Sequence, residues 1–487
     1  MADRRIVSCV VAALVLASGC RTPRQVRDAE YPRVVHAVKQ ANFSPDAAAM
    51  AVAPVAAEFE GPQPVERLIQ YALNQNPDVQ AARKRLEAAA MQVPQAASLK
   101  DPMVDATGWP FYPNVPQTAS GRMTVDLMVS QDVPWYGKLG AKAAAAEAEA
   151  NAARARLATA ELETIENVKK AYYELYFIQQ ATIVTQEERD LLIQIRDTAN
   201  ARYRAALTSQ QDVLRAELEL SNIEENLIRL RQQLDSGQAR LARQLHVAPQ
   251  TKLRALDRLT PEDVPRDLDA LQRRAVAARP ELHAQLAMLQ RDRQMVEVAQ
   301  LEYLPDFTFK AGWGEMTTDK ALAPTADGID NVTIGMGVNV PIYRKRLNAG
   351  VRQAEANVVA TAREYDSLRD ATLEQVLDLF AQAQSQQELL TLFEEDILPK
   401  ARQTLEVSTP AYNVGQIDFL TLLDNFRQLL RYEVNYRRLE ASLHQTLAEL
   451  ERVVGGYMGE PGEAIPVPEL QTPPAAAPML LPPPEQE

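Results

Sequence analysis

The stretches that decide this fold are PDFTFKAGW, residues 305–313, and VTIGMGVNV, residues 332–340. In each, every second side chain is apolar and those between are polar or small, which is typical of a β-strand with one apolar and one water-facing side. A ragged stretch, Met103 to Trp109, and a cleaner one, Met123 to Ser130, show the same pattern earlier in the chain. Each is about the length of a strand that crosses a bilayer within a barrel. Four strands cannot close a membrane barrel, which needs about eight, so several chains must share one.

The N-terminal residues indicate the compartment. Two arginines precede a short apolar run, which cannot span a membrane and has the layout of a secretory signal. The run ends in LASGC, residues 16–20, which resembles a bacterial lipoprotein box with Ala17 where Leu is more usual. We therefore expect residues 1–19 to be a signal peptide and Cys20 to be the lipidated first residue of the mature chain, with Arg21 favouring the outer membrane. A plain secreted protein with a free Cys20 is the alternative.

Composition indicates a folded, water-contacting and mostly helical protein. Of the 487 residues 24% are charged and 6% aromatic, Ala is abundant, and no apolar run reaches the roughly 18 residues of a membrane helix. The net charge of −13 argues against a nucleic-acid partner, because phosphate binding needs a basic face. Only Cys9 accompanies Cys20, and it lies in the expected signal peptide, so we expect no intramolecular disulfide.

Nothing in the sequence supports catalysis. The four histidines are scattered and have no partner at the spacing of metal ligands: His36, His246, His283 and His444. There is no phosphate-binding loop, nucleophile elbow or Cys-His set. Carboxylate pairs such as Glu187-Glu188 lie in helical patterns, and we expect them to face water. We therefore expect neither enzyme activity nor a metal site, and no cofactor other than the lipid on Cys20.

The chain is organised as two copies of one plan. VPWYGK at residues 133–138 and VPIYRK at residues 340–345 share the motif Val-Pro-x-Tyr-x-Lys at a separation of 207 positions. Two earlier prolines, Pro77 and Pro280, lie 203 positions apart. A Pro after a strand lacks the N–H that a ladder needs and supplies the fixed φ of a helix start. Each copy should therefore run through a helix, a strand pair, a long helix, a turn and a further helix.

This plan divides the chain into six regions. We expect a signal peptide, an irregular lipid-anchored arm, a first repeat, a linker, a second repeat and a disordered Pro-rich tail, at residues 1–19, 20–61, 62–248, 249–265, 266–455 and 456–487. The tail is dominated by Pro with Ala and Glu, a composition that does not support a packed core.

Beyond each Val-Pro motif the apolar residues follow the 3-4 spacing of helices that pack along seams. The stretch 138–200 would form a helix about 90 Å long at 1.5 Å per residue. The helical pattern breaks at residues 206–209 and again at 413–415, which we interpret as tight turns between helices. Gly415 supplies backbone freedom for the second turn, and Ser209 can cap the helix after the first.

Between about Val65 and Val454 the sequence resembles the TolC-like outer membrane efflux protein family. The resemblance rests on the duplicated order of elements, on the Val-Pro-x-Tyr-x-Lys motif, and on Tyr-Asn-Val-Gly-x(6)-Leu-Leu-Asp at Tyr412 to Asp424. It implies a mostly α-helical trimer in which four strands from each chain close one twelve-stranded outer membrane barrel, continuous with a long helical barrel in the periplasm. Three chains with four strands each also satisfy the closure that the alternating stretches require.

The resemblance further implies where the protein meets its partners and where its channel narrows. In the family, the helix turns form a periplasmic tip that meets the adaptor, or membrane fusion, protein of a tripartite pump. The matching residues are Ala205, Ala206, Leu207, Asn413, Val414 and Gly415, with Ala206 where a Gly is common. Family members often carry acidic residues just inside the tip, and Asp424 and Asp212 occupy such places. Three-fold symmetry would make each a ring of carboxylates that selects cations, whereas for Asp212 an ordinary helix-start cap is the alternative.

The function implied is a passive exit duct in the outer membrane for an inner membrane pump of the resistance-nodulation-division type. The outer component of a type I protein secretion system has the same architecture and is one alternative. A lipid-anchored coiled-coil scaffold without a pore is another, but a scaffold has no use for Phe307, Phe309 and Trp313 on a lipid-facing side. The phrase QDVPWYGKL, residues 131–139, resembles members paired with heavy-metal exporters, which favours metal ions over drugs as cargo.

Overall fold

The chain divides into two compact units, residues 1–56 and 57–487. The computed structural model describes residues 28, 30–36, 59, 61–109 and 116–456. In the first unit, residues 31–36 form a short helix where the sequence predicted an irregular arm, because the Asp28 side chain accepts a hydrogen bond from the N–H of Glu30 (2.8 Å) and begins the turn. The expected signal peptide, the lipidation site Cys20 and the tail beyond Gly456 lie outside the described residues.

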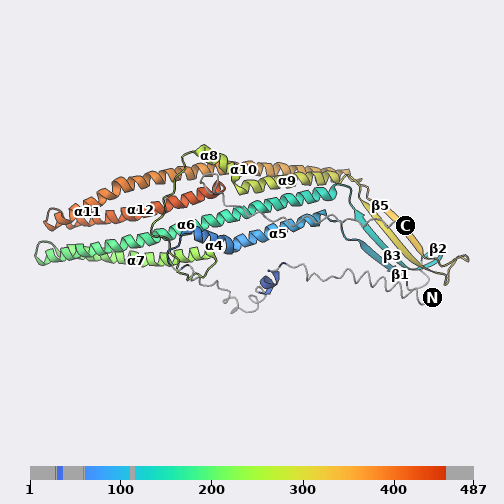
Figure 1. Ribbon diagram of the computed structural model, residues 1–487, viewed down its shortest axis with the longest axis horizontal. Helices are drawn as coiled ribbons and strands as arrows, with labels where there is room; N and C mark the ends of the chain where they lie inside the picture. Colours follow the sequence, from blue (N-terminus) through green and yellow to red (C-terminus); the bar gives the residue numbers. More distant parts are fainter. Residues whose placement is uncertain (1–27, 29, 37–58, 60, 110–115, 457–487) are drawn as a thin grey trace, which may run out of the picture. The chain divides into compact units, whose positions relative to one another are not determined.

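Helices make up most of the second unit (Figure 1). Its first half contains α4 (Val65–Gln75), α5 (Pro77–Ala97), β1 (Met103–Gly108), β2 (Gln117–Thr118), β3 (Gly121–Val133), α6 (Lys138–Arg204) and α7 (Gln210–Leu245). Its second half contains α8 (Leu268–Ala278), α9 (Pro280–Leu301), β4 (Phe307–Thr317), β5 (Asn331–Val338), α10 (Arg344–Leu392), η3 (Phe393–Ile397), α11 (Leu398–Asn413) and α12 (Phe419–Val453). Apart from the short β2, both halves follow the same order of helices and strands, and α10, η3 and α11 stand where the first half has α6.

The strands form one antiparallel sheet in the order β1-β3-β4-β5, with β2 beside β3. All four strands predicted from alternation are confirmed. β3 and β4 run further than the alternation predicted, to Val133 and to Thr317. Backbone pairing with a neighbouring strand extends these ends beyond the residues that show the two-sided pattern.

The register of the sheet places most of the apolar side chains of the four strands on one face. Directly opposed apolar pairs are Val104 with Val129, Leu127 with Trp313, and Phe309 with Met336. The other face carries polar and small side chains, among them Asp126, Thr308 and Thr333. Because successive side chains alternate, a slip of one residue in any pair would mix the two faces.

Local sequence explains where several helices begin. Pro77 and Pro280 are the first residues of α5 and α9. At this position a backbone N–H would make no hydrogen bond within the helix, so its absence in Pro costs nothing. Asn76 also accepts a hydrogen bond from the N–H of Asp78 at 2.8 Å. α6 follows Gly137, whose φ of 91° lies in the left-handed region that Gly adopts without strain.

α6 is the central helix of the unit. Its 67 residues would span about 100 Å at 1.5 Å per residue, and it contacts α5, α7, α9 and α12. Tyr172 and Tyr176 on its buried side donate hydrogen bonds to the carbonyl of Gln63 (3.0 Å) and to Glu440 (2.9 Å). The predicted linker, residues 249–265, contains no helix and packs beside this core.

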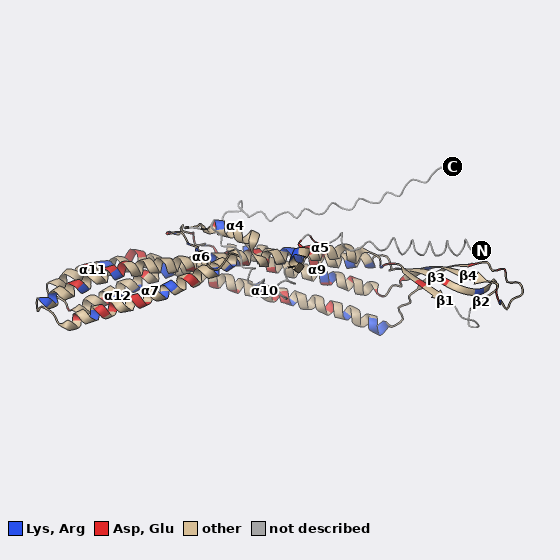
Figure 2. Cartoon of the chain, turned by 90° about the horizontal axis from the view of Figure 1, so that it is seen from below, with Lys and Arg blue, Asp and Glu red and all other residues tan. Residues whose placement is uncertain are grey.

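Charged residues of both signs are interspersed along the helices (Figure 2). Some pair between helices, as Lys170 of α6 does with Glu449 of α12 at 2.8 Å. Half-exposed pairs of this kind contribute about 1 kcal/mol or less, so they orient the helices rather than hold them together. None of the described helices combines the length and apolar character that a membrane span requires.

Candidate functional site

The turns between α6 and α7 and between α11 and α12 close with the same hydrogen bonds. In each, one N–H donates to the carbonyl five residues back, and the preceding N–H donates to the carbonyl three residues back. The bonds measure 2.8–3.0 Å and join Leu207 to Arg202, Ala206 to Tyr203, Gln416 to Ala411, and Gly415 to Tyr412. Such a nested pair satisfies the last free carbonyls of a helix. Both predicted turns are therefore confirmed, and they share one backbone plan.

The residue that reverses the chain in each turn has a left-handed backbone. Gly415 has a φ of 80°, and Ala206, where a Gly was the expected residue, has a φ of 52°. A Cβ in this region costs about 1 kcal/mol, which Gly415 avoids and Ala206 does not. Ser209 caps α7 as predicted, because its side chain accepts a hydrogen bond from the N–H of Gln211 at 2.9 Å.

Arg202 links the two turns, which lie side by side (Figure 1). Its Nη1 donates to the carbonyl oxygen of Asn413, and its guanidinium lies 4.9 Å from the centre of the Tyr412 ring. Tyr412 in turn packs edge-on against Phe419, with 5.5 Å between the ring centres. One arginine of the first half thus holds the end of the second half in place.

Below the turns, the ends of α6, α7, α11 and α12 share one apolar core. Its buried members are Leu192, Ile195, Ala199, Val213, Ala216, Ile223, Leu405, Tyr412, Phe419, Leu422, Leu423, Phe426 and Leu429. Because side chains from both halves interdigitate here, the two turns are carried on a single four-helix bundle rather than on independent hairpins.

The six residues predicted to contact an adaptor protein all lie at the surface of these turns. Ala205, Ala206 and Leu207 are exposed in the first turn, and Asn413, Val414 and Gly415 in the second. Leu207 and Val414 are 66% and 70% exposed, so each turn presents one large apolar side chain to its surroundings. Single exposed apolar residues are ordinary, but two on adjoining turns offer a small apolar surface to a partner.

Asp212 lies in the first turn of α7 and is half-buried. It accepts a hydrogen bond from the hydroxyl of Thr208, and its negative charge near a helix N-terminus is favourable. Burial, together with the charge of Asp212, raises the pKa of the Tyr412 phenol. Asp212 thus makes the contacts expected of an acidic residue at the start of a helix, and it does so where the two turns meet.

Asp424 lies further from its turn, on the exposed side of α12. Its side chain is 64% exposed, and its ion pair with Arg427 measures 3.8 Å. Arg427 is held more closely by Glu219 of α7, at 2.5 Å. The carboxylate of Asp424 is therefore only loosely compensated within the chain, and no hydrogen bond or ion pair among the described residues joins it to Asp212.

Comparison with known proteins identifies the fold. Residues 68–245 and 271–456 match the family model for outer membrane efflux proteins. The chain belongs to the outer membrane efflux protein family. Over 404 residues it is 23% identical to the cobalt-zinc-cadmium resistance protein CzcC of Cupriavidus metallidurans, an alignment that covers 82% of this chain and 91% of CzcC.

Solved structures of outer membrane proteins have the same fold as this chain. The outer membrane protein VceC of Vibrio cholerae superimposes with a TM-score of 0.67 at 22% identity, covering 80% of this chain and 96% of VceC. The CmeC outer membrane channel of Campylobacter jejuni superimposes with a TM-score of 0.68 at 15% identity, covering 80% of this chain and 85% of CmeC. The family predicted from the sequence is confirmed.

The second long helix of this outer membrane efflux protein contains an irregularity that sequence reasoning missed. α10 passes into the π-helical turn η3, where the N–H of Leu398 donates to the carbonyl of Phe393, five residues back. Pro399 follows, and it has no N–H to donate within a helix. A π-turn is one of the few ways in which a helix absorbs such a break. Pro399 was the signal that could have predicted it.

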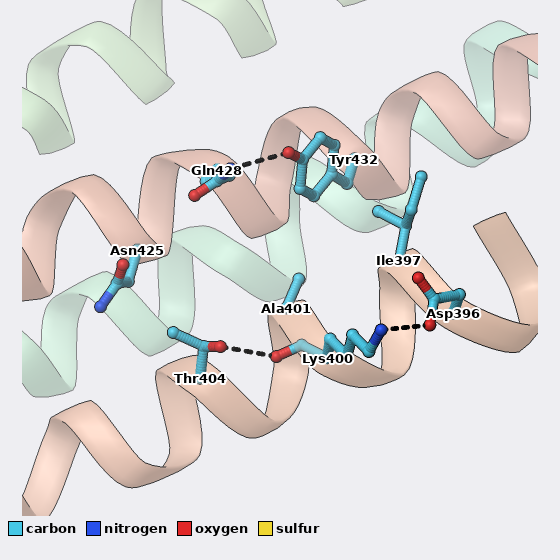
Figure 3. Close-up of a pocket in the computed structure, with 8 residues that line it drawn as sticks. All are labelled: Asp396, Ile397, Lys400, Ala401, Thr404, Asn425, Gln428 and Tyr432. Carbon is cyan, nitrogen blue, oxygen red and sulfur yellow. Dashed lines mark hydrogen bonds and ion pairs between the residues drawn. The ribbon is translucent and has the colours of Figure 1, made fainter. Parts of the chain in front are cut away.

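A groove of about 250 Å³ lies beside η3, between α11 and α12 (Figure 3). Its two charged residues, Asp396 and Lys400, pair with each other. On the opposite side, the amide of Gln428 donates to the hydroxyl of Tyr432 at 2.7 Å. The groove is polar and open, and its charges are already compensated, so it has none of the features of an enclosed ligand site.

One buried carboxylate contradicts the sequence prediction. Glu187 is exposed as expected, but Glu188 is only 6% exposed, on the side of α6 that faces α11 and α12. Burial, and then the nearby charges of Glu433 and Glu187, raise the pKa of Glu188 to about 7, partly offset by Arg402. Helical spacing alone could not predict this, because the helices that cover Glu188 come from the other half of the chain. Within the described ranges, no group of His, Cys, Asp and Glu side chains is arranged to hold a metal ion.

Proposed function

We propose that this protein is the outer membrane channel of a tripartite efflux system. In this proposal it is a homotrimer that passively conducts substrates from an inner membrane pump and a periplasmic adaptor across the outer membrane. The observation that carries the proposal is the sheet, which has one apolar face, one polar face and open edges at β1 and β5. Three such sheets joined edge to edge would make a closed twelve-stranded barrel with its apolar face toward lipid.

The helices would continue this barrel into the periplasm. The two halves are then repeats of one unit, and the long helices of three chains enclose a hollow cylinder. The turns at residues 205–207 and 413–415 would form the tip that meets the adaptor, and their exposure on one shared bundle supports that role. Asp424 and Asp212 are the two candidates for a gating ring of three carboxylates just inside this tip, and we place the gate at Asp424 because it is the more weakly compensated of the two.

Metal ions are the cargo that we favour. The relative CzcC is a cobalt-zinc-cadmium resistance protein, and the QDVPWYGKL phrase of this chain points in the same direction. The pump would then be of the resistance-nodulation-division type. The outer component of a type I protein secretion system is the alternative within transport.

Conductance and efflux test the proposal together. Purified trimers added to a planar lipid bilayer should give uniform conductance steps, whereas a pore-free scaffold would give none. In cells lacking their own outer component, this protein expressed with its pump and adaptor should restore growth on cobalt, zinc and cadmium. Trimers that insert without conducting would refute the channel. Export of a protein without metal resistance would favour the secretion alternative.

We also propose that Cys20 carries the lipid that anchors the mature chain. One acyl-bearing anchor in addition to a barrel would hold the chain more firmly than lipid alone. Replacing the thiol by Cys20→Ser should leave precursor or soluble periplasmic material and abolish labelling by a palmitate analogue. Unchanged labelling of the variant would defeat this idea while leaving the channel proposal intact.

A further inference from the structure

The sheet of one chain ends in two unpaired edges. Among the described strands, in the order β1-β3-β4-β5, β1 pairs only with β3 and β5 pairs only with β4. Within a bilayer an open edge leaves backbone N–H and C=O groups without partners, which is strongly unfavourable. In the trimer proposed above, on which this inference rests, β5 of one chain must therefore pair with β1 of the next.

The junction between the two halves of one chain provides a template for this contact. There β3 pairs with β4, and Lys138 at the start of α6 reaches Asp306 just before β4. The Nζ of Lys138 donates to Oδ1 of Asp306 at 2.8 Å and to the carbonyl of Leu304 at 3.1 Å. Asp306 also accepts from the N–H of Trp135 at 2.9 Å. With its side chain 2% exposed, Lys138 joins the two halves where strands become helices.

The strand registers identify the corresponding positions of the two halves. Ser130 lies opposite Met103 in the first pair of strands, and Gly337 lies opposite Thr308 in the second. Ser130 and Gly337 each precede the Val of the shared Val-Pro motif by three positions. Met103 and Thr308 are therefore equivalent, and so are the residues just before them.

Both halves carry the sequence Leu-x-Asp at this place. It occurs at residues 99–101 and again at residues 304–306, and in each half its Asp lies two positions before the equivalent residue, Met103 or Thr308. The Val-Pro-x-Tyr-x-Lys motif ends in Lys138 in the first half and in Lys345 in the second. Asp101 therefore corresponds to Asp306, and Lys345 corresponds to Lys138.

Asp101 and Lys345 have no partner among the described residues of one chain. Both are exposed, and neither side chain makes a hydrogen bond or ion pair with any described residue. Lys345 lies in the first turn of α10, as Lys138 lies in the first turn of α6. Asp101 precedes β1 and Lys345 follows β5, so the two opposite charges stand at the two open edges of the sheet. Leu99 and Ile342 beside them are 46% and 66% exposed.

We propose that Lys345 of one chain forms an ion pair with Asp101 of the next chain. Its ammonium group would also donate a hydrogen bond to the Leu99 carbonyl of that next chain. The pair repeats between chains the contact that Lys138 and Asp306 make within one chain. The partner of each open edge is thus a second copy of this chain, and each subunit boundary carries one such pair.

The same correspondence specifies the strand register across the boundary. Gln131 lies opposite Phe309 in the β3–β4 pairing, and carrying this over places Val338 opposite Val104 of the next chain. Both valines lie on the apolar face of the sheet. The apolar face therefore continues without a break from one chain to the next.

Cross-linking tests the register. A chain with Val104→Cys and Val338→Cys, treated with a short bifunctional thiol reagent after assembly, should give covalently linked trimers on denaturing gels. The matched control combines Val338→Cys with Met103→Cys, because a slip of one residue puts the two thiols on opposite faces and should lower linking by about tenfold or more. Each single-cysteine variant controls for the native cysteines.

Charge reversal tests the ion pair. Lys345→Glu and Asp101→Lys each place like charges opposite one another, and each should lower the temperature at which the trimer dissociates. Combining them restores opposite charges and should recover most of the loss. Arg344→Gln is the control and should leave the transition unchanged, because Arg344 lies over the Tyr303 ring of its own chain at 5.4 Å.

The outcomes separate this inference from the proposed function. A wild-type protein that is monomeric in detergent and in membranes would overturn the proposed trimer, and the inference with it. Conducting trimers that link only through the slipped pair, or that gain nothing from the double charge reversal, would overturn the inference alone. Linking through Val104 and Val338, with rescue by the double reversal, would establish it.

Discussion

The two halves of this protein follow the same order of elements by different means. The first half runs from its strands to its turn in α6, an unbroken helix of 67 residues. The second half uses α10, η3 and α11, of 49, 5 and 16 residues. The interruption coincides with Pro399, which cannot donate a helical hydrogen bond. One architecture therefore tolerates a local break where a π-turn restores the direction of the helix.

The halves also differ in where they carry strain and buried charge. The first half places Ala206 in a left-handed conformation and buries Glu188, whereas the second half places Gly415 in the matching turn. Matching positions with different residues provide internal controls, since one half shows what the shared backbone accepts. The experiments below exploit these differences.

The largest effect is expected where an acidic residue is moved between the faces of the sheet. Thr333 and Ile334 stand where the first half has Asp126 and Leu127, 207 positions earlier. In the proposed trimer, Ile334→Asp would expose a charge to hydrocarbon at a cost of about 2 kcal/mol in each chain. Thr333→Asp copies what the first half already carries and should be tolerated. The fraction of heat-resistant trimer measures both, and equal losses would contradict the assigned faces.

A pH-dependent effect is expected at Glu188. Its pKa of about 7 lies above the ordinary 4.5, so between these values the folded state keeps a proton that the unfolded state has released. The wild type should therefore lose up to about 3 kcal/mol of stability as the pH rises through this window. Glu188→Gln should match the wild type near pH 4 and exceed it at pH 8 in thermal unfolding.

Glu187→Gln is the matched control, because it removes the exposed neighbouring charge but keeps the buried carboxylate, and it should retain most of the loss of stability between pH 4 and pH 8. A Glu188→Gln protein that is less stable than the wild type at pH 8 would show that the carboxylate is needed in its charged form.

A smaller effect is expected from exchanging the residues that reverse the two turns. Ala206→Gly relieves the left-handed strain and should raise the unfolding free energy by about 0.5 kcal/mol, after the greater flexibility of Gly in the unfolded chain is counted. Gly415→Ala introduces the same strain and should lower it by about 1 kcal/mol. Urea midpoints at unchanged slope measure both. A loss of stability in Ala206→Gly would mean that contacts of the Ala206 methyl group outweigh its backbone strain.

The smallest effect on stability, and the most specific effect on function, is expected at the carboxylates near the turns. Asp424→Asn should lower cation selectivity and weaken block by multivalent cations in single-channel recordings, with folding unchanged because Asp424 is exposed. Asp212→Asn should cost about 0.5 kcal/mol at the start of α7 and leave selectivity unchanged. The opposite pattern would place the ring in the first half.

Much of the fold could be predicted from single stretches of sequence. The four strands were predicted because alternation is a property of adjacent residues. The turns were predicted where Gly415 and Ser209 interrupt helical spacing, since turn and capping chemistry is equally local. The candidate residues of the tip lie where the sequence placed them, on two exposed turns. The arrangement that joins the turns was not predictable, because Arg202 and Asn413 are 211 positions apart.

What the sequence by itself determined, then, is the identity of each element and the side of it that is apolar, because both depend on neighbours within a few residues. Only the tertiary structure decided the burial of Glu188, the left-handed conformation of Ala206, and the contact of Lys138 with Asp306. These depend on which helices and strands from distant parts of the chain come to lie against them. Desolvation and hydrogen bonding act on a side chain through all of its neighbours in space, and those neighbours exist only once the chain has folded.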